Sequence, residues 1–269
     1  MNKIKIIFPA FPRIIAGVCV ALSGNFLISC GSSKPVPQAT GTNVIETRLA
    51  EGKAAYAKED WLEAIRIFDE IRLQAPTSST AIEATFLEGM SRYFSGTYIS
   101  AAVDFRAVRR NYPTSALAPR AQFMVGESYN MLSPRPELDQ TYSASALNEY
   151  QVFLRDYSNG DKALVDSAQM RITEIRNKLG LKFLLAAELY IKLSDRKAAI
   201  LGFGRVVENY YDTPAAVEAQ LRIAEVQYGR KKMKDAQDAI QIFEDKFFQN
   251  ATPAQRARAR AIKTSLSLN

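Results

Sequence analysis

Residues 52–76 of this sequence read GKAAYAKEDWLEAIRIFDEIRLQAP, and residues 89–113 read GMSRYFSGTYISAAVDFRAVRRNYP. The two segments match position for position at an offset of 37 residues, with glycine first, alanine thirteenth, phenylalanine seventeenth and proline last. Apolar residues recur at helical spacing, and the chain around them has hardly any run of alternating β-branched residues. The pattern therefore predicts a repeated unit of helices.

This pattern resembles the tetratricopeptide repeat, a helix-turn-helix unit of about 34 residues. Small residues lie where the two helices of such a unit cross, because a larger side chain would push the helices apart. We expect Gly52 and Gly89 at this place in the first helix, and Pro76 and Pro113 at the end of the second helix. Weaker copies follow, and the small residues of the second helices in all five copies are Ala64, Ala101, Ala146, Ala199 and Ala236.

Two insertions interrupt the repeats. In the third copy the interval between the two small residues is eight residues longer than in the first, and prolines in the extra segment 133–140 exclude a simple helix there. An additional helix from about Lys162 to Leu179 precedes the fourth copy. Because single repeats cannot bury their apolar faces, they stack on one another. The sequence predicts an all-α fold, a tetratricopeptide-repeat superhelical solenoid of five repeats over residues 44–250, with a basic capping helix and tail in residues 251–269.

The first thirty residues have the composition of an export signal. Residues 1–13 carry three basic residues and no acidic one, and a mainly apolar stretch of about fifteen residues follows. Leu27-Ile28-Ser29-Cys30 resembles the lipobox of bacterial lipoproteins, which are lipidated on the cysteine and cleaved ahead of it. We therefore expect a lipoprotein signal peptide in residues 1–29, lipidation of Cys30, and a flexible tether over residues 30–43. The alternative is a buried cysteine at the end of an anchor helix.

The composition excludes several classes of chemistry. The sequence has no histidine and only two cysteines, which excludes histidine-dependent catalysis, a zinc site built from these residues and a disulfide framework. The net charge of +7 falls to +4 without the signal, because 32 basic and 28 acidic residues remain, so a nucleic-acid partner is not indicated. No phosphate loop, nucleophile elbow or convergent carboxylate pair is recognisable. We expect a protein that is not an enzyme and that has no metal or cofactor.

A second resemblance rests on features beyond the generic repeat. The second copy closes on Arg110-Asn111-Tyr112-Pro113-Thr114-Ser115, the insertion holds Leu138-Asp139-Gln140-Thr141, and the additional helix ends Arg176-Asn177-Lys178-Leu179. In this order, and behind a lipobox, residues from Val44 to about Lys232 resemble the BamD family, the five-repeat lipoproteins of the outer-membrane β-barrel assembly machine. The sequence departs from that family where Tyr-Pro often closes a repeat, since the third and fourth copies have Tyr-Ser and Tyr-Asp.

The resemblance implies a non-enzymatic scaffold, anchored by lipid on the periplasmic face of the outer membrane. Such a protein contacts the barrel-forming BamA subunit and helps to present unfolded outer-membrane protein precursors. Its amino-terminal repeats are associated with the precursor's carboxy-terminal signal, an extended segment with aromatic and apolar side chains. Another envelope repeat lipoprotein, such as a coordinator of peptidoglycan synthesis, fits the repeats and lipobox equally well. A superhelical lytic enzyme would need a catalytic domain, for which no residues are left over.

Two sets of residues are candidate binding sites. Exposed positions of the first helices offer adaptable apolar contacts, so we expect a precursor-binding groove lined by Lys53, Tyr56, Phe86, Met90, Tyr93 and Tyr129. Packing between helices is the alternative role for each tyrosine. Polar and basic turns of the last two repeats are the candidates for partner docking, namely Asn209, Tyr210, Tyr211, Asp212, Arg230, Lys231 and Lys232. For Arg256, Arg260 and Lys263 on the last helix, a solvated cap is favoured over docking.

Overall fold

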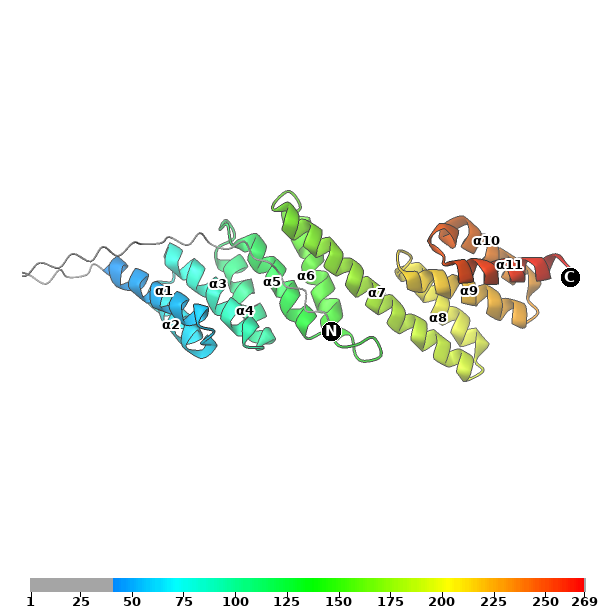
Figure 1. The fold of residues 1–269 in the computed structure, drawn as a ribbon, viewed down its shortest axis with the longest axis horizontal. Helices are drawn as coiled ribbons and strands as arrows, with labels where there is room; N and C mark the ends of the chain where they lie inside the picture. Colours follow the sequence, from blue (N-terminus) through cyan, green and yellow to red (C-terminus); the bar gives the residue numbers. More distant parts are fainter. Residues whose placement is uncertain (1–40, 269) are drawn as a thin grey trace, which may run out of the picture. The chain divides into compact units, whose positions relative to one another are not determined.

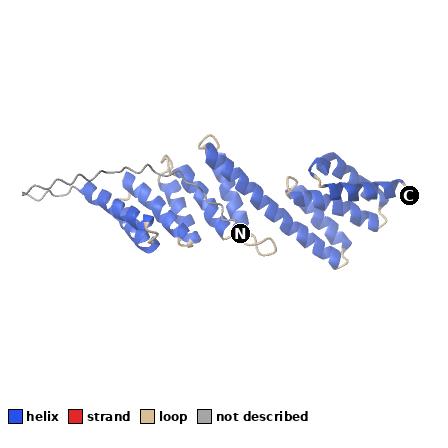
Figure 2. Ribbon diagram, viewed as in Figure 1, coloured by secondary structure: helices blue, strands red, loops and turns tan. Residues whose placement is uncertain are grey.

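Helices follow one another along the chain, and each packs against the next. The computed structural model describes residues 41–268, and within that range all regular secondary structure is helical (Figure 2). The elements, labelled in Figure 1, are α1 (Gly41–Ala57), α2 (Trp61–Gln74), α3 (Ser79–Phe94), α4 (Tyr98–Asn111), α5 (Ala118–Met131), α6 (Thr141–Tyr157), α7 (Lys162–Lys192), α8 (Arg196–Asn209), α9 (Pro214–Gly229), α10 (Met233–Ile242), a π-helical turn η1 (Phe243–Phe247), a 3-10 turn η2 (Phe248–Asn250) and α11 (Pro253–Ser267). The expected all-α solenoid of tetratricopeptide type is confirmed. The predicted signal peptide and Cys30 lie outside the described residues.

A glycine of the first helix lies beneath an aromatic ring of the second helix in each of the first three repeats. A Cβ atom added to Gly52 would lie 2.6 Å from Cε1 of Phe68, and one added to Gly89 would lie 2.8 Å from Cε1 of Phe105. Only glycine permits so close an approach between the two helices. The small residues expected in the second helices have no exposed surface in any of the five repeats: Ala64, Ala101, Ala146, Ala199 and Ala236.

The turn between the two helices of a repeat contains one residue with left-handed backbone geometry. Glu59, Gly96, Ser194 and Lys231 have φ angles of 61°, 82°, 63° and 58°. Each follows the small residue of its first helix by seven positions, so the turn has the same design in repeats one, two, four and five. Only one of the four is glycine, although an L side chain in this conformation costs about 1 kcal/mol.

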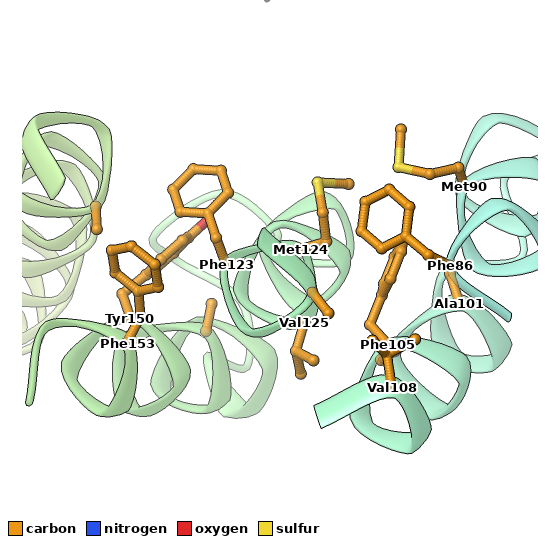
Figure 3. Packing of buried hydrophobic residues seen from close by; sticks show 14 of the residues in the cluster. Phe86, Met90, Ala101, Phe105, Val108, Phe123, Met124, Val125, Tyr150 and Phe153 are labelled. Carbon is orange, nitrogen blue, oxygen red and sulfur yellow. The ribbon is translucent and has the colours of Figure 1, made fainter. Parts of the chain in front are cut away.

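The apolar core is divided into clusters that follow the order of the chain. The cluster of repeats two and three extends to the first half of α7, and Figure 3 shows Phe86 facing Phe105 and Phe123 lying beside Tyr150 and Phe153. The ring centroids of Phe86 and Phe105 are 5.5 Å apart. A separate cluster packs the second half of α7 against α8 and α9, and another joins α9, α10 and α11. Each repeat is therefore stabilised mainly by its neighbours.

The helix ahead of the fourth repeat differs from the prediction. The sequence predicted an additional helix ending near Leu179, but α7 continues to Lys192 and also supplies the first helix of repeat four. Gly180 lies at the junction and is buried, and a Cβ atom added there would lie 2.9 Å from Oγ1 of Thr213. This glycine permits close packing against the start of α9. With no proline nearby to break the hydrogen-bond ladder, the helix continues.

The carboxy-terminal helix α11 covers the last repeat. The side chain of Thr252 accepts a hydrogen bond from the backbone of Gln255, whose side chain bonds back to the backbone of Thr252. Ala259 and Ile262 are buried against α9 and α10. The helix thus hides an apolar face that would otherwise be open to water, as the end of a repeat array requires.

Candidate functional site

Tyr56 and Tyr93, two of the predicted groove residues, belong to one group of aromatic side chains in repeats one and two. The ring centroid of Tyr56 lies 5.3 Å from that of Trp61 and 6.2 Å from that of Phe94. Trp61 stacks on Phe94 at 5.5 Å, and Tyr93 lies 5.6 Å from Phe94 and 5.4 Å from Tyr98. We call these five residues the aromatic cluster.

Three members of the aromatic cluster were missed in the sequence. Trp61 and Tyr98 occupy the same position of their repeats, as the first residue of the second helix, and this coincidence was the signal available. Phe94 is 45% exposed, so the cluster presents apolar surface to its surroundings. Burial raises the pKa of Tyr56 and of Tyr93, so both hydroxyl groups stay neutral at physiological pH. The cluster is therefore an uncharged, partly exposed aromatic surface.

Phe86 and Met90 are not exposed groove residues, and that prediction is wrong. Their exposed fractions are 5% and 4%, and both belong to the core cluster shown in Figure 3. Helix α3 packs on both α2 and α4, so the face that periodicity marks as available is covered by the following repeat. Both side chains act in packing.

Two cations of the amino-terminal repeats have different surroundings. Lys53 Nζ lies 2.7 Å from Glu83 Oε1, in an exposed ion pair that links α1 to α3 and contributes little to stability. The guanidinium of Arg120 lies 5.8 Å from the ring centroid of Phe86. Burial lowers the pKa of Arg120, although the group stays charged. The amino-terminal repeats thus combine aromatic rings with a half-buried positive charge.

Tyr129 makes its contacts away from the aromatic cluster. Its hydroxyl accepts a hydrogen bond of 2.8 Å from Arg106 Nη1, and the same guanidinium lies 5.1 Å from its ring centroid. The ring stacks on that of Tyr142 at 6.3 Å. Tyr129 therefore links α5 to α4 and α6, which is the packing role considered as its alternative.

Most of the predicted docking segment 209–212 is used inside the fold. Arg176 of α7 donates from Nε to Asp212 Oδ2 at 2.7 Å and from Nη2 to the Asn209 carbonyl at 3.0 Å. The hydrogen bond from Arg176 lowers the pKa of Asp212. Tyr210 stacks on Phe183 at 5.5 Å. Tyr211 is 68% exposed, and Asn209 and Asp212 also keep exposed surface.

The second predicted docking segment, which we call the basic turn, comprises Arg230, Lys231 and Lys232. Arg230 donates to Gln227 at 3.1 Å, whereas Lys231 and Lys232 are exposed and form no ion pair with any residue of the described chain. Lys232 is the N-cap of α10, a position where a carboxylate would bond the free backbone N–H groups and favour the helix dipole. The corresponding N-cap of α2 is Asp60, whose side chain accepts from the backbone. Repeat five thus places exposed positive charge where local stability favours an acid.

Three of the four basic residues of α11 contact residues of the preceding elements. Arg258 Nη1 lies 2.9 Å from Glu218 Oε1, and Lys263 Nζ lies 2.7 Å from Glu244 Oε2. Arg256 Nε donates to the Phe248 carbonyl at 3.0 Å, while Arg260 is exposed. These contacts hold α11 on the last repeat and support a capping role.

Within residues 41–268 no group of three or more acidic or cysteine side chains could hold a metal ion. No helix in this range is long and apolar enough to cross a membrane.

The crossing geometry, the shared turns and the terminal cap define a tetratricopeptide-repeat solenoid protein. The model of the YfiO family, described as outer membrane lipoprotein, matches residues 46–242, and the chain belongs to that family. This agrees with the resemblance to BamD-type lipoproteins seen in the sequence. A comparison with curated proteins found no match.

Solved structures similar to this chain are also repeat proteins. The TPR2AB domain of yeast Sti1, solved as a complex with pHSP90, is 14% identical, with a TM-score of 0.44, over 84% of this chain and 100% of that chain. A tetratricopeptide repeat protein of Parabacteroides merdae is 13% identical, with a TM-score of 0.36, over 83% and 79% of the two chains. A repeat protein of Thermus thermophilus is 15% identical, with a TM-score of 0.33, over 82% and 99%.

Proposed function

We propose that this chain is a BamD-like subunit of the outer-membrane β-barrel assembly machine. In this role it is a non-enzymatic scaffold, anchored by lipid on the periplasmic face of the outer membrane, that binds unfolded outer-membrane protein precursors and a BamA-type barrel subunit. The family match over residues 46–242 supports the assembly role. The aromatic cluster is the observation that carries the binding role.

The aromatic cluster suits an extended segment with aromatic and apolar side chains. Its rings meet edge to face or stacked, so an incoming ring can extend the same arrangement and gain about 0.5–1.5 kcal/mol beyond area burial. Phe94 is the most exposed member and offers the first contact. Because the rings are neutral, their own contacts with a precursor depend weakly on its charge. The cluster thus fits many related segments.

The precursor site can be tested with a peptide that ends in a precursor's terminal signal. Tyr56→Ala together with Tyr93→Ala should weaken crosslinking of this peptide strongly, since truncation at a binding hot spot costs on the order of 2 kcal/mol. Phe94→Ala tests the same surface with less effect on the fold, because this side chain is exposed. Tyr142→Ala, an exposed aromatic residue outside the cluster, is the matched control. Unchanged crosslinking of folded variants would reject this site.

For the barrel subunit, we propose the basic turn and Tyr211 as the docking surface. The supporting observation is that Lys231 and Lys232 have no acidic partner in the described chain and lie where an acid would favour the helix. Charged groups at the rim of an interface mainly set the association rate and its salt dependence. An acidic patch on the partner would therefore bind here most strongly at low salt.

Substitutions in the basic turn separate binding from folding. Lys232→Asp places a capping residue at the start of α10, so the helix should gain about 1 kcal/mol while capture of the barrel subunit weakens. Lys231→Glu should add to the loss of capture. Lys58→Glu in the turn of repeat one is the control, since it changes charge at the other end of the array. If both basic-turn variants retain the barrel subunit at wild-type strength in pull-downs from solubilised membranes, the docking surface lies elsewhere.

Lipid anchoring at Cys30 is part of the same proposal. Each buried methylene of an acyl chain contributes about 0.8 kcal/mol, and several chains anchor firmly where one chain does not. Cys30→Ala should leave the protein uncleaved or released from the membrane fraction. Intact mass measurement of the wild type checks the premise, because a mature chain that starts at residue 30 without acyl mass contradicts it.

A further inference from the structure

The second half of α7 extends past the helix on which its first half packs. α6 begins at Thr141, and the loop before it is held by α7, since Lys178 Nζ donates to Ser133 Oγ and Lys182 Nζ donates to the Leu138 carbonyl, both at 2.6 Å. The rest of α7 continues beyond this end of α6, alongside α8 (Figure 1). Among the described residues, the buried apolar side chains of this half pack with α8 and α9.

This arrangement leaves one flank of repeat four without a neighbour. The first helices of the other inner repeats contact two second helices each: α3 lies between α2 and α4, α5 between α4 and α6, and α9 between α8 and α10. In repeat four the buried α7 residues that share a cluster with α6 end at Leu179, and those that follow share a cluster with α8 and α9. Within the part of the chain that the structure describes, the opposite flank of residues 183–193 is therefore an open position.

A stripe of leucines occupies this flank. Leu181 and Leu185 are each 41% exposed, Leu189 is 54% exposed and Leu193 is 65% exposed. Because they recur every four residues, they lie along one side of the helix over a length of about 18 Å. The α7 residues buried against α8, among them Leu184 and Ala187, lie on a different side of the helix. The stripe is thus an exposed apolar surface on a helix of fixed position.

Three lysines lie among these leucines. Lys178, Lys182 and Lys192 stand three or seven residues from Leu185, which places them on the same side of the helix. None of the three forms an ion pair with a carboxylate anywhere in residues 41–268. The nearby Glu188 is already paired with Arg222 at 2.6 Å. We call these leucines and lysines the leucine–lysine face.

We propose that the leucine–lysine face is the docking site for an amphipathic α-helix of a partner protein, with an apolar stripe bordered by aspartate or glutamate. Such a helix fills the open position as the second helix of a preceding repeat does, inserting residues at i, i+3, i+4 and i+7 between the leucines. The acidic border pairs with the exposed Lys192 and with the remaining N–H groups of Lys178 and Lys182, whose bonds to Ser133 and Leu138 leave their charges uncompensated, and this gives the docking its charge complementarity. The proposal does not depend on precursor binding, and its residues are different from those of the basic turn.

The test places a photo-crosslinking amino acid at Leu185 or Leu189 of the full-length protein in its native envelope. The control position is Leu201 of α8, which is exposed and outside the face. We expect a protein adduct at the first two positions and none at the control. Mass spectrometry should map the adduct to a segment with apolar residues at helical spacing and flanking carboxylates.

Charge reversal then tests the lysines. Lys192→Glu should reduce the adduct by about five- to tenfold, Lys192→Arg should restore it, and Lys197→Glu on α8 should leave it unchanged. Lys192 is exposed and forms no ion pair within residues 41–268, so thermal unfolding should not change. The proposal is overturned by absence of a protein adduct, by adducts to lipid or to a second copy of this chain, by a mapped segment without carboxylates, or by an adduct that Lys192→Glu leaves intact.

Discussion

The second and fourth repeats solve the same packing problem with the small residue on opposite helices. In repeat two Gly89 of the first helix receives the ring of Phe105. In repeat four the first helix carries Ala187, and Gly202 of the second helix faces it, so that a Cβ atom added to Gly202 would lie 2.8 Å from the Ala187 Cβ. The requirement shared by the repeats is the close approach of two helices, and either helix can supply the space.

The repeats also differ at the first residue of the second helix. This position holds Trp61 and Tyr98 in repeats one and two, and Arg196 and Met233 in repeats four and five. The aromatic cluster can form only where this residue is aromatic and the next repeat adds further rings. A single repeat position thus separates the apolar surface of the amino-terminal repeats from the charged turns of the carboxy-terminal repeats.

The largest expected effect comes from removing a buried ring, and it tests whether repeats two and four are equally well packed. Phe105→Ala and Phe203→Ala each remove a fully buried ring at the same repeat position, and each should lower the free energy of unfolding by about 3–5 kcal/mol. Hydrogen exchange should show loosening confined to neighbouring helices, α3–α5 for the first and α7–α9 for the second. A uniform loss of protection in both variants would contradict the division of the core into clusters.

A pH effect near neutrality is expected in repeat two. Burial, followed by the neighbouring Glu88, raises the pKa of Asp104 to about 7, and Arg92 Nε lies 3.2 Å from its Oδ2. Arg92 and Arg72 act to lower this pKa, whereas Asp69 acts to raise it. A carboxyl with a raised folded-state pKa stabilises the fold while protonated, so stability should fall as pH rises from about 5 to 8, by roughly 2–3 kcal/mol.

Asp104→Asn is the matched variant for this prediction, because it cannot ionise. Chemical denaturation at pH 5 and at pH 8 should show a smaller loss for the variant than for the wild type. Equal pH dependence of the two proteins would show that Asp104 does not titrate in this range.

Two glycines of α8 give a sharper test of the fourth repeat. Gly202→Ala introduces a methyl group against Ala187 and should destabilise by about 1–3 kcal/mol. A Cβ atom added at Gly204 meets no atom within 4 Å. Gly204→Ala should therefore stabilise the fold by about 1 kcal/mol, because alanine favours the helix. Thermal unfolding compares the two variants directly. If both variants shift the unfolding temperature in the same direction, the close approach of Ala187 and Gly202 is contradicted.

The smallest effects are expected at the turns. Gly96→Ala should destabilise by about 1 kcal/mol, because alanine disfavours the left-handed backbone, while Lys231→Gly should stabilise by a similar or smaller amount. Denaturation midpoints measure both. Opposite shifts support one shared turn design, and two shifts of the same sign would show that local contacts dominate these turns.

The repeats could be predicted from the sequence because their signals are local and recur. The buried alanines at 64, 101, 146, 199 and 236 lie where the pattern placed them. The site was predicted less well. Tyr56 and Tyr93 do share one cluster, but Phe86 and Met90 are core residues, since helical periodicity shows which residues share a face and does not show whether the next repeat covers it.

By itself the sequence determined the class of fold, the repeat boundaries near the small residues and the family resemblance, because helix crossings impose residue types at fixed spacing. Tertiary structure decided the rest. It packed Gly180 of the continuous helix α7 against the start of α9, and it paired Asp212 with Arg176 from a distant part of the chain. Such pairings join residues tens of positions apart, and only the folded stack of helices determines which side chains meet and which faces stay open.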